Sequence, residues 1–267
     1  MNGPGAGGGP CPSEAELLTV AGAAVDAAAE ELLARFGGEL IGLRSKSSPT
    51  DPVSAADLAA EAAIRRVLEQ LRPDDSFLGE EGGSVPRDGS LRWVVDPLDG
   101  TVNYVYGIPA FAVSVACEDA AGVVVGVVLD PLRGERFEAT RSGPPTLNGS
   151  PINGSQCHKL SSALVATGFA YEAAVRERQA LVLHELLGRV RDIRRAGAAA
   201  LDLAWCACGR LDAYYERGVN AWDIAAGALI CARAGLDVRS LGGSDSLPDG
   251  ILVAPAALID ELERLVD

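Results

Sequence analysis

The segment 93–101 places two aspartates, Asp96 and Asp99, directly after an apolar run. The run is typical of a buried strand, and Gly100 and Thr101 then begin a short turn or helix. Carboxylates at the end of a strand can point into one cleft, while the N–H groups of Gly100 and Thr101 meet an anion at a helix N-terminus. Cations on one side of a cleft and amide donors on the other are typical of a phosphate-binding site. The same residues also suit an ordinary surface turn, because Asp, Pro and Gly favour turns.

Four further positions carry acids that could join such a site. Glu80 and Glu81 are adjacent and repel each other unless a cation is near, although a solvated acidic turn is the alternative. Asp223 lies in the first turn of an apolar helix, where it is either a ligand or a cap that favours the helix dipole. Asp57 equally suits a capping box. Lys46 lies in a polar loop, where most lysines are simply solvated.

The acids offer only oxygen donors, and the chain holds only two histidines, His158 and His184. Hard oxygen ligands favour Mg²⁺ over Zn²⁺. A pair of such ions roughly 3.5–4 Å apart neutralises a phosphate and activates a water for attack on it.

Hydrophobic periodicity and turn residues predict an α+β chain, or layered α and β elements with two sub-domains in close contact. Ser13 and Ser54 each begin a capping box at the start of a helix. We expect helices at 13–36, 54–71, 172–190, 198–208, 222–234 and 255–266. We expect strands at 91–96, 110–117, 123–129, 135–139, 164–166, 212–215 and 251–253, with 77–78 a short apolar pair and 144–154 a loop.

Composition limits the classes of partner. The 267 residues are 48% hydrophobic and carry a formal charge of -14, which disfavours binding to nucleic acid or to anionic lipid. The sequence contains no run of about 18 apolar residues, so we expect no membrane span. Residues 1–12 are rich in Gly and Pro and lack the features of a signal peptide, so we expect a disordered tail and a cytoplasmic protein. The six cysteines are scattered, which favours reduced thiols.

Several motifs together resemble the inositol monophosphatase family. They are Lys46-Ser47-Ser48-Pro49 with Asp57, Gly79-Glu80-Glu81, Asp96-Pro97-Leu98-Asp99-Gly100-Thr101-Val102-Asn103-Tyr104, Leu147-Asn148-Gly149, Thr167-Gly168-Phe169-Ala170-Tyr171, and Trp222-Asp223-Ile224-Ala225-Ala226-Gly227. The similarity covers about residues 14–266. It implies a layered αβαβα sandwich of the inositol monophosphatase and fructose-1,6-bisphosphatase type, with 13–267 as a single catalytic unit. Within that unit, about 13–155 would carry the metal site and about 156–267 the substrate wall.

The resemblance also assigns roles to the acids. Glu80, Asp96 and the Leu98 carbonyl would hold the first metal, and Asp96, Asp99 and Asp223 the second, in a site for about two to three Mg²⁺ ions. A third ion would lie near Glu80, which also counts among the catalytic residues. Glu81 and Lys46 would lie behind these ligands and support them.

Thr101, bonded to Asp57, would orient the attacking water, and the amides of Gly100 and Thr101 would hold the phosphate. The substrate wall would comprise Gly197, Ala198, Ala199 and Glu216 together with Asp99 and Asp223. A carboxylate at Glu216 favours a polyol, although an exposed acid at a strand end is the alternative. Ala198 stands where relatives often carry Ser or Thr.

The implied activity is Mg²⁺-dependent, lithium-sensitive hydrolysis of a small phosphorylated polyol, with myo-inositol monophosphate as the expected substrate. Fructose-1,6-bisphosphate, histidinol phosphate and a 3′-phosphoadenosine nucleotide are the alternatives with the same chemistry. A regulatory binding protein of the transcription machinery is the non-enzymatic alternative. The resemblance also implies a homodimer.

Overall fold

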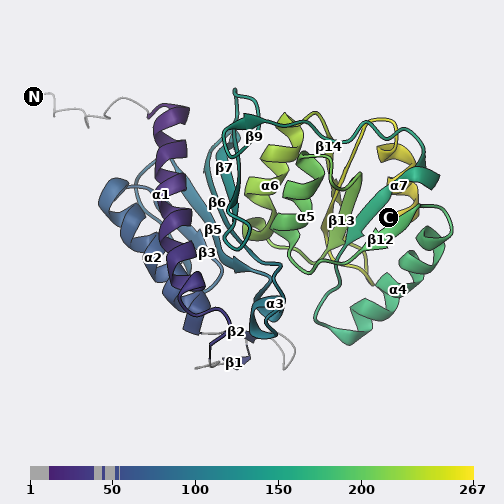
Figure 1. Cartoon of the computed structure of the whole chain (residues 1–267), viewed down its shortest axis with the longest axis horizontal. Coiled ribbons are helices and arrows are strands. Elements are labelled where there is room, and N and C mark those ends of the chain that lie inside the picture. Colours follow the sequence, from purple (N-terminus) through teal and green to yellow (C-terminus); the bar gives the residue numbers. More distant parts are fainter. Residues whose placement is uncertain (1–11, 39–43, 46–51, 54) are drawn as a thin grey trace, which may run out of the picture.

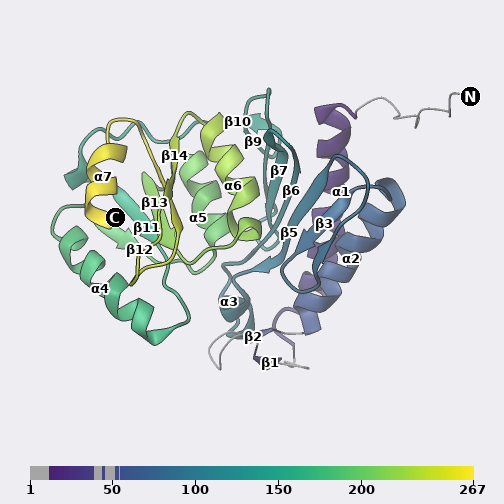
Figure 2. The same ribbon diagram turned by 180° about the vertical axis from the view of Figure 1, so that it is seen from behind.

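The computed structural model describes residues 12–38, 44–45, 52–53 and 55–267, and it stacks helices and sheets in the order α, β, α, β, α (Figure 1). Helices α1 (Glu14–Leu33) and α2 (Ala55–Leu71) cover one face of an eight-stranded sheet. Helices α5 (Ala199–Ala207) and α6 (Ala221–Arg233) lie between that sheet and a five-stranded one. Helices α4 (Ala173–Leu187) and α7 (Ile259–Val266) cover the far face, as the reverse view shows (Figure 2).

The larger sheet has the strand order β10-β9-β8-β7-β6-β5-β3-β4. Only β3 and β5 within it run parallel, and the other neighbours are antiparallel. The bounds are β3 (Ser76–Gly79), β4 (Gly83–Val85), β5 (Arg92–Asp99), β6 (Ala112–Asp119), β7 (Gly122–Asp130), β8 (Glu135–Thr140), β9 (Thr146–Leu147) and β10 (Ser150–Pro151).

The smaller sheet has the order β12-β11-β13-β15-β14. Its strands are β11 (Leu164–Thr167), β12 (Asp192–Arg194), β13 (Ala213–Arg217), β14 (Asp237–Leu241) and β15 (Gly250–Ala254). The remaining elements are short: β1 (Arg44–Ser45), β2 (Pro52–Val53), α3 (Thr101–Val105) and the 3₁₀ turn Leu160–Ser162.

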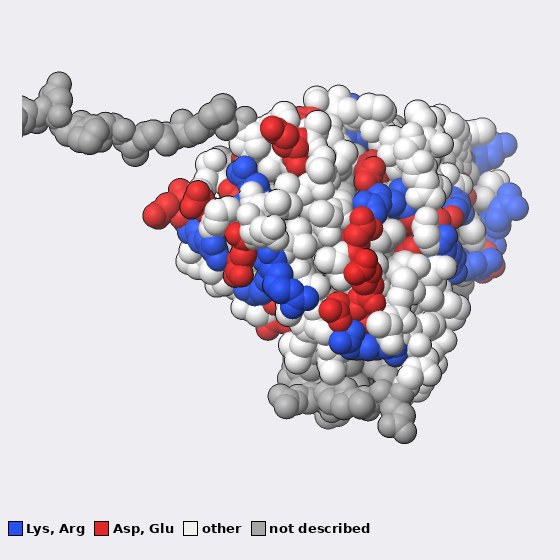
Figure 3. Space-filling model, turned by 60° about the vertical axis from the view of Figure 1, so that its left-hand side comes forward, with Lys and Arg blue, Asp and Glu red and all other residues white. Residues whose placement is uncertain are grey.

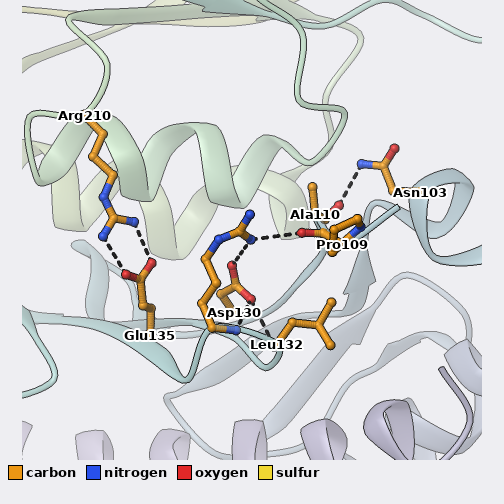
Figure 4. Close-up of polar contacts among 8 residues, drawn as sticks. Asn103, Pro109, Ala110, Asp130, Leu132, Glu135 and Arg210 are labelled. Carbon is orange, nitrogen blue, oxygen red and sulfur yellow. Dashed lines mark hydrogen bonds and ion pairs between the residues drawn. The ribbon is translucent and has the colours of Figure 1, made fainter. Parts of the chain in front are cut away.

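Small side chains allow the middle helices to approach the larger sheet closely. A Cβ built on Gly126 of β7 would lie 2.8 Å from the Cα of Ala226 in α6. Strands β5, β6 and β7 are buried on both faces, which explains their nearly continuous apolar sequences. Polar contacts add to this packing: Arg210, just after α5, binds Glu135 of β8 through two contacts of 2.5 Å (Figure 4).

The layered α+β fold expected from the sequence is confirmed, and so is the capping box at Ser13, whose amide donates to Glu16 at 2.8 Å. The division at residues 155 and 156 stays a prediction. The predicted tail, Lys46 and the Ser54 cap lie outside the described residues, apart from Pro12.

Several boundaries differ from expectation, and most differences concern short or exposed elements. The 77–78 pair is part of strand β3, the 144–154 loop contains β9 and β10, and edge strands β12 and β14 were not expected. These strands are too short, or too exposed, to show an alternating pattern. Helix α7 begins at Ile259 instead of 255, because Pro255 first accepts a turn hydrogen bond of 2.8 Å from Leu258.

No helix among the described residues is long and apolar enough to cross a membrane. The five described cysteines, Cys117, Cys157, Cys206, Cys208 and Cys231, are all free thiols, as expected.

Candidate active site

The end of strand β5 bends where the two aspartates lie. Asp96 pairs with Ser114 of β6 and Asp99 with Ala112, so three steps along β5 match two along β6 and one residue bulges. Pro97, which has no N–H to offer the ladder, falls inside this bulge. A bulge re-aims the side chains that follow it. The Leu98 amide also donates to Asp96 at 3.0 Å, which fixes the bend.

Gly100 follows immediately and makes the turn into α3 possible. Its φ of 90° is left-handed, a conformation that glycine adopts without strain. A Cβ there would also lie 3.0 Å from the Ala110 carbonyl oxygen and 3.2 Å from the Ala198 Cβ. Asn103, the third residue of α3, donates to the carbonyls of Ala110 (2.7 Å, Figure 4) and Ala196 (2.8 Å), and so ties this turn to the segment before α5.

Helix α2 contributes Asp57 to the same corner. Asp57 is fully buried, and its Oδ1 lies 2.9 Å from the Thr101 hydroxyl. That hydroxyl is also 3.1 Å from the Leu98 carbonyl oxygen. A hydroxyl has one hydrogen to donate, so it satisfies one of these acceptors at a time and keeps a lone pair for another donor.

Glu61, one helical turn after Asp57, is a site residue that the sequence analysis missed. Its Oε2 accepts the amide hydrogens of Glu81 (2.9 Å) and Gly82 (3.2 Å), and its Oε1 lies 2.9 Å from Arg65 Nε. It therefore holds the turn that carries Glu80. The available signal was its spacing, because an acid four residues after Asp57 lies on the same helix face.

Glu80 lies beside Asp96 because β3 and β5 are parallel. Gly79 pairs with Val95, and the Glu80 amide donates to the Val95 carbonyl at 3.3 Å. Parallel neighbours end on the same side of a sheet, so this pairing brings the two acids together.

Asp99 caps the N-terminus of α5 from across the layer boundary. Its carboxylate accepts the amide hydrogens of Ala199 (3.1 Å) and Ala200 (2.6 Å). These N–H groups have no partner within the helix, so an acid from β5 satisfies them. Ala198, predicted for the substrate wall, is buried against Gly100 and does not line the cavity.

Asp223 comes from the first turn of α6 and accepts the Asn220 amide hydrogen at 2.6 Å. Ser114, opposite Asp96 in the sheet, donates to the Trp222 carbonyl at 3.2 Å and so fixes the start of α6 beside β5. Asp223 consequently lies near Asp96, and its charge raises the pKa of Asp96.

Glu216 forms the opposite wall from strand β13. It accepts a hydrogen bond of 2.8 Å from the Tyr214 hydroxyl, and its carboxyl group lies so close to Gly168 that a Cβ there would overlap it. Burial raises the pKa of Glu216, and Tyr214 and Arg195 oppose this rise. The exposed-acid alternative for Glu216 is therefore wrong.

One cavity of about 940 Å³ collects most of the predicted residues. Glu80, Asp96, Leu98, Asp99, Gly100, Thr101, Gly197, Ala199, Glu216 and Asp223 line it. Asp57 and Glu81 lie behind it, and Lys46 is outside the described residues.

The carboxylates of this cavity disfavour one another's ionisation. Burial raises the pKa of Asp96 well above its usual range, and the charges of Glu80, Asp99 and Asp223 raise it further. Burial and then Asp223 raise the pKa of Asp99, against the effect of its amide donors. Burial raises the pKa of Asp223 to about 6. A cation among these groups would relieve the repulsion.

The residues fit Mg²⁺ in charge and donor type. As the side chains stand, no three Asp, Glu, His or Cys groups of the described chain converge on one point to hold an ion. Amides already bind several of the oxygens, including those of Asp99 and Asp223. Each carboxylate oxygen has a second lone pair, and Mg²⁺ usually keeps several waters, so these contacts leave room for a cation.

Comparison with known proteins agrees with the resemblance in the sequence. Inositol-1-monophosphatase SuhB of Mycobacterium tuberculosis is 46% identical over 236 residues, which cover 82% of this chain and 79% of that protein. Nus factor SuhB of Pseudomonas aeruginosa is 40% identical over 238 residues, with coverage of 83% and 88%. The crystal structure of extragenic suppressor protein suhB from Bartonella henselae superimposes with a TM-score of 0.86 at 35% identity, over 95% of this chain and 98% of that one. A model of the inositol monophosphatase family matches residues 13–266, and the chain belongs to that family.

Proposed function

We propose that the protein hydrolyses a small phosphomonoester in a Mg²⁺-dependent reaction, with myo-inositol monophosphate as its substrate. The observation that carries this proposal is the set of four acids, Glu80, Asp96, Asp99 and Asp223, that lines one cavity together with Thr101. Like charges this close are costly, since Asp96 and Asp99 are buried, and divalent cations that also attract a phosphate offset them.

Glu80, Asp96, the Leu98 carbonyl, Asp99 and Asp223 would hold the ions, with Glu81 in support. When bound, Mg²⁺ neutralises the phosphate and lowers the pKa of water. The amides of Gly100 and Thr101, which begin α3 and line the cavity, would hold phosphate oxygens.

Thr101 and Asp57 would position the attacking water. When the Thr101 hydroxyl donates to Asp57, its free lone pair accepts a hydrogen from water and aims the water's oxygen at phosphorus. The buried carboxylate of Asp57 increases the basicity of that hydroxyl. A proton passed from water to the hydroxyl could therefore continue to Asp57, 2.9 Å away.

We infer the alcohol part of the substrate from the position of Glu216. A partly buried carboxyl group that lines the cavity accepts hydrogen bonds from hydroxyls, which suits a polyol. The test is phosphate release, with and without Mg²⁺, from inositol 1-phosphate, fructose-1,6-bisphosphate, histidinol phosphate and a 3′-phosphoadenosine nucleotide. We expect the highest kcat/KM for inositol 1-phosphate. Release from histidinol phosphate alone would overturn this choice of substrate.

Asp99→Asn tests the site itself. We expect at least a 100-fold loss of turnover, on the order of what removal of a key catalytic group costs, together with weaker Mg²⁺ binding by calorimetry. Because Asp99 also caps α5, circular dichroism must show that the variant is folded. Normal turnover by a folded Asp99→Asn protein would contradict the assignment.

A regulatory role on the transcription machinery is a second candidate, favoured by the relatives named Nus factor SuhB. On the face drawn in Figure 3, basic side chains lie next to acidic ones, and the described residues of this face form no continuous basic surface. Contact with protein is therefore a better hypothesis than contact with RNA. A pull-down that recovers RNA polymerase equally with the wild type and with Asp99→Asn would support this role.

Two family properties complete the proposal. Li⁺ would inhibit by replacing the second metal, which titration of the activity with LiCl would test. The protein would be a homodimer, and light scattering that gave the mass of one chain would contradict this.

A further inference from the structure

Arg217 follows Glu216 on strand β13 and is almost completely buried, with only 4% of its surface exposed. Its guanidinium group has five N–H donors in a rigid fork and stays charged in proteins. A buried charge of this kind is costly unless every donor finds an acceptor.

All five donors of Arg217 are engaged. Nη1 donates to the carbonyls of Gly242 (2.8 Å) and Pro248 (3.0 Å). Nη2 donates to the Val266 carbonyl (3.1 Å) and to Asp267 (2.9 Å), and Nε donates to the Val266 carbonyl (3.3 Å).

The first two acceptors bracket a loop that forms the outer wall of the cavity. Residues 244–248 of this loop line the cavity, as Glu216 does. Within the loop, the Ser244 amide donates to the Leu247 carbonyl at 2.7 Å and the Gly243 amide donates to Asp249 at 2.6 Å. Its flanks are also held by the pairing of Leu241 with Gly250 and by the Gly218 amide, which donates to the Asp249 carbonyl at 2.8 Å. Arg217 therefore fixes the two ends of the loop to each other and to the end of α7.

We infer that Arg217 is a positioning residue that sets the loop 242–248 against the cavity and thereby determines how tightly the alcohol part of the substrate binds. The inference rests on the proposed function. Arg217 touches neither the acids nor Thr101, so the phosphate chemistry should not depend on it.

The decisive comparison pairs Arg217→Met with Arg239→Met. Arg239 of β14 also links the smaller sheet to α7, through Asp260 (2.7 Å) and Glu263 (2.5 Å), but within the described part of the chain it makes no hydrogen bond or ion pair with the loop. Arg217→Lys is the conservative variant, and with three donors on a flexible stem it should restore the wild-type behaviour only partly.

We expect Arg217→Met to raise KM for inositol 1-phosphate about 10-fold while kcat stays within about twofold, the pattern of lost substrate binding. For p-nitrophenyl phosphate, whose leaving group has no hydroxyls, KM should change less than about twofold. Arg239→Met should leave both substrates unaffected. Equal losses of kcat for both substrates, or the same KM change in Arg239→Met, would overturn the inference.

Hydrogen exchange of the amides of residues 243–249 gives a readout that needs no activity. We expect exchange to rise at least about 10-fold in Arg217→Met and to stay unchanged in Arg239→Met. If Arg217→Met does not fold, Asp267→Ala, which removes one of the five hydrogen bonds of Arg217 by shortening an exposed side chain, should still speed exchange of the loop. Unchanged exchange would refute the inference. If the wild type does not hydrolyse inositol 1-phosphate, the proposed substrate fails, and the KM comparison moves to the ester that it does hydrolyse.

Discussion

Glu61→Gln tests whether helix α2 positions the Glu80 turn. Glu61 is 4% exposed and accepts two backbone hydrogens, from Glu81 and Gly82. The fit is tight, because a Cβ on Gly79 would lie 2.6 Å from Glu61 Oε2 and one on Gly82 would lie 2.5 Å from Oε1. Glutamine has one acceptor oxygen in place of two, so either the turn or Arg65 loses its partner.

The magnitude follows from these contacts. Hydrogen bonds to a charged group contribute about 1.5–3 kcal/mol each and neutral ones about 0.5–1.5 kcal/mol, so the two bonds to the turn lose about 2–3 kcal/mol when the glutamine oxygen replaces the carboxylate. The partly exposed ion pair with Arg65 adds about 0–1 kcal/mol. We therefore expect the free energy of unfolding to fall by about 2–4 kcal/mol in urea titrations. We also expect the Mg²⁺ concentration for half-maximal activity to rise about 10-fold, because residues behind metal ligands commonly have that effect.

Glu31→Gln is the matched control. Glu31 also pairs with an arginine four residues away, Arg35 at 2.5 Å, and lies 3.7 Å from Arg66, but these pairs are partly exposed and none of their residues lines the cavity. We expect a loss below about 0.5 kcal/mol and no change in Mg²⁺ dependence. If Glu61→Gln behaves like this control, the turn does not depend on Glu61 and our reasoning fails.

Three further predictions test single contacts. Thr101→Val should lower kcat at least about 100-fold with normal Mg²⁺ binding, while Thr101→Ser retains most activity; a Val variant with a third of the wild-type kcat would exclude a role for the hydroxyl. Asp202 is 1% exposed with both carboxyl oxygens unpartnered among the described residues, and burial, then Glu216 and Asp99, raise its pKa well above 3.8. The folded state thus binds this proton more tightly than the unfolded state, so the wild type loses stability as pH rises above about 4. The free energy of unfolding of Asp202→Asn should therefore be about 1–3 kcal/mol higher than that of the wild type at pH 8, with no such gain at pH 4. Gly168→Ala should displace the Glu216 carboxylate and raise KM for a polyol phosphate several-fold with little loss of stability, whereas Gly126→Ala, which meets the backbone of α6, should lower the melting temperature and leave KM unchanged.

The sequence alone predicted that the central acids and Thr101 lie together, because the signals for this are local. Asp96, Asp99 and Thr101 follow an apolar strand within one short segment, and the structure keeps them together in one cavity. The environment of Glu216 could not be decided that way. Its burial depends on Gly168, which lies 48 residues earlier and becomes its neighbour only when β11 and β13 pair.

Glu61 and Arg217 show what local patterns miss. With Arg65 four residues later, Glu61 has the sequence pattern of an ordinary surface ion pair. Arg217 looks like a polar residue at the end of a strand. Each acts through backbone groups of a distant segment, and backbone groups leave no mark on the sequence. Only the tertiary packing identifies their partners.

The spacing of Asp57 and Glu61 explains how one helix can serve two chemical segments. Four residues of an α-helix rise about 6 Å, close to the separation of about 4.8 Å between adjacent strands. Asp57 therefore reaches the segment that follows β5 at Thr101, while Glu61 reaches the turn that follows its neighbour β3. A shift of either acid by one residue would rotate it about 100° around the helix and remove it from its partner. The geometry of α2 thus couples the position of the Thr101 hydroxyl to that of Glu80, although the two lie on different strands.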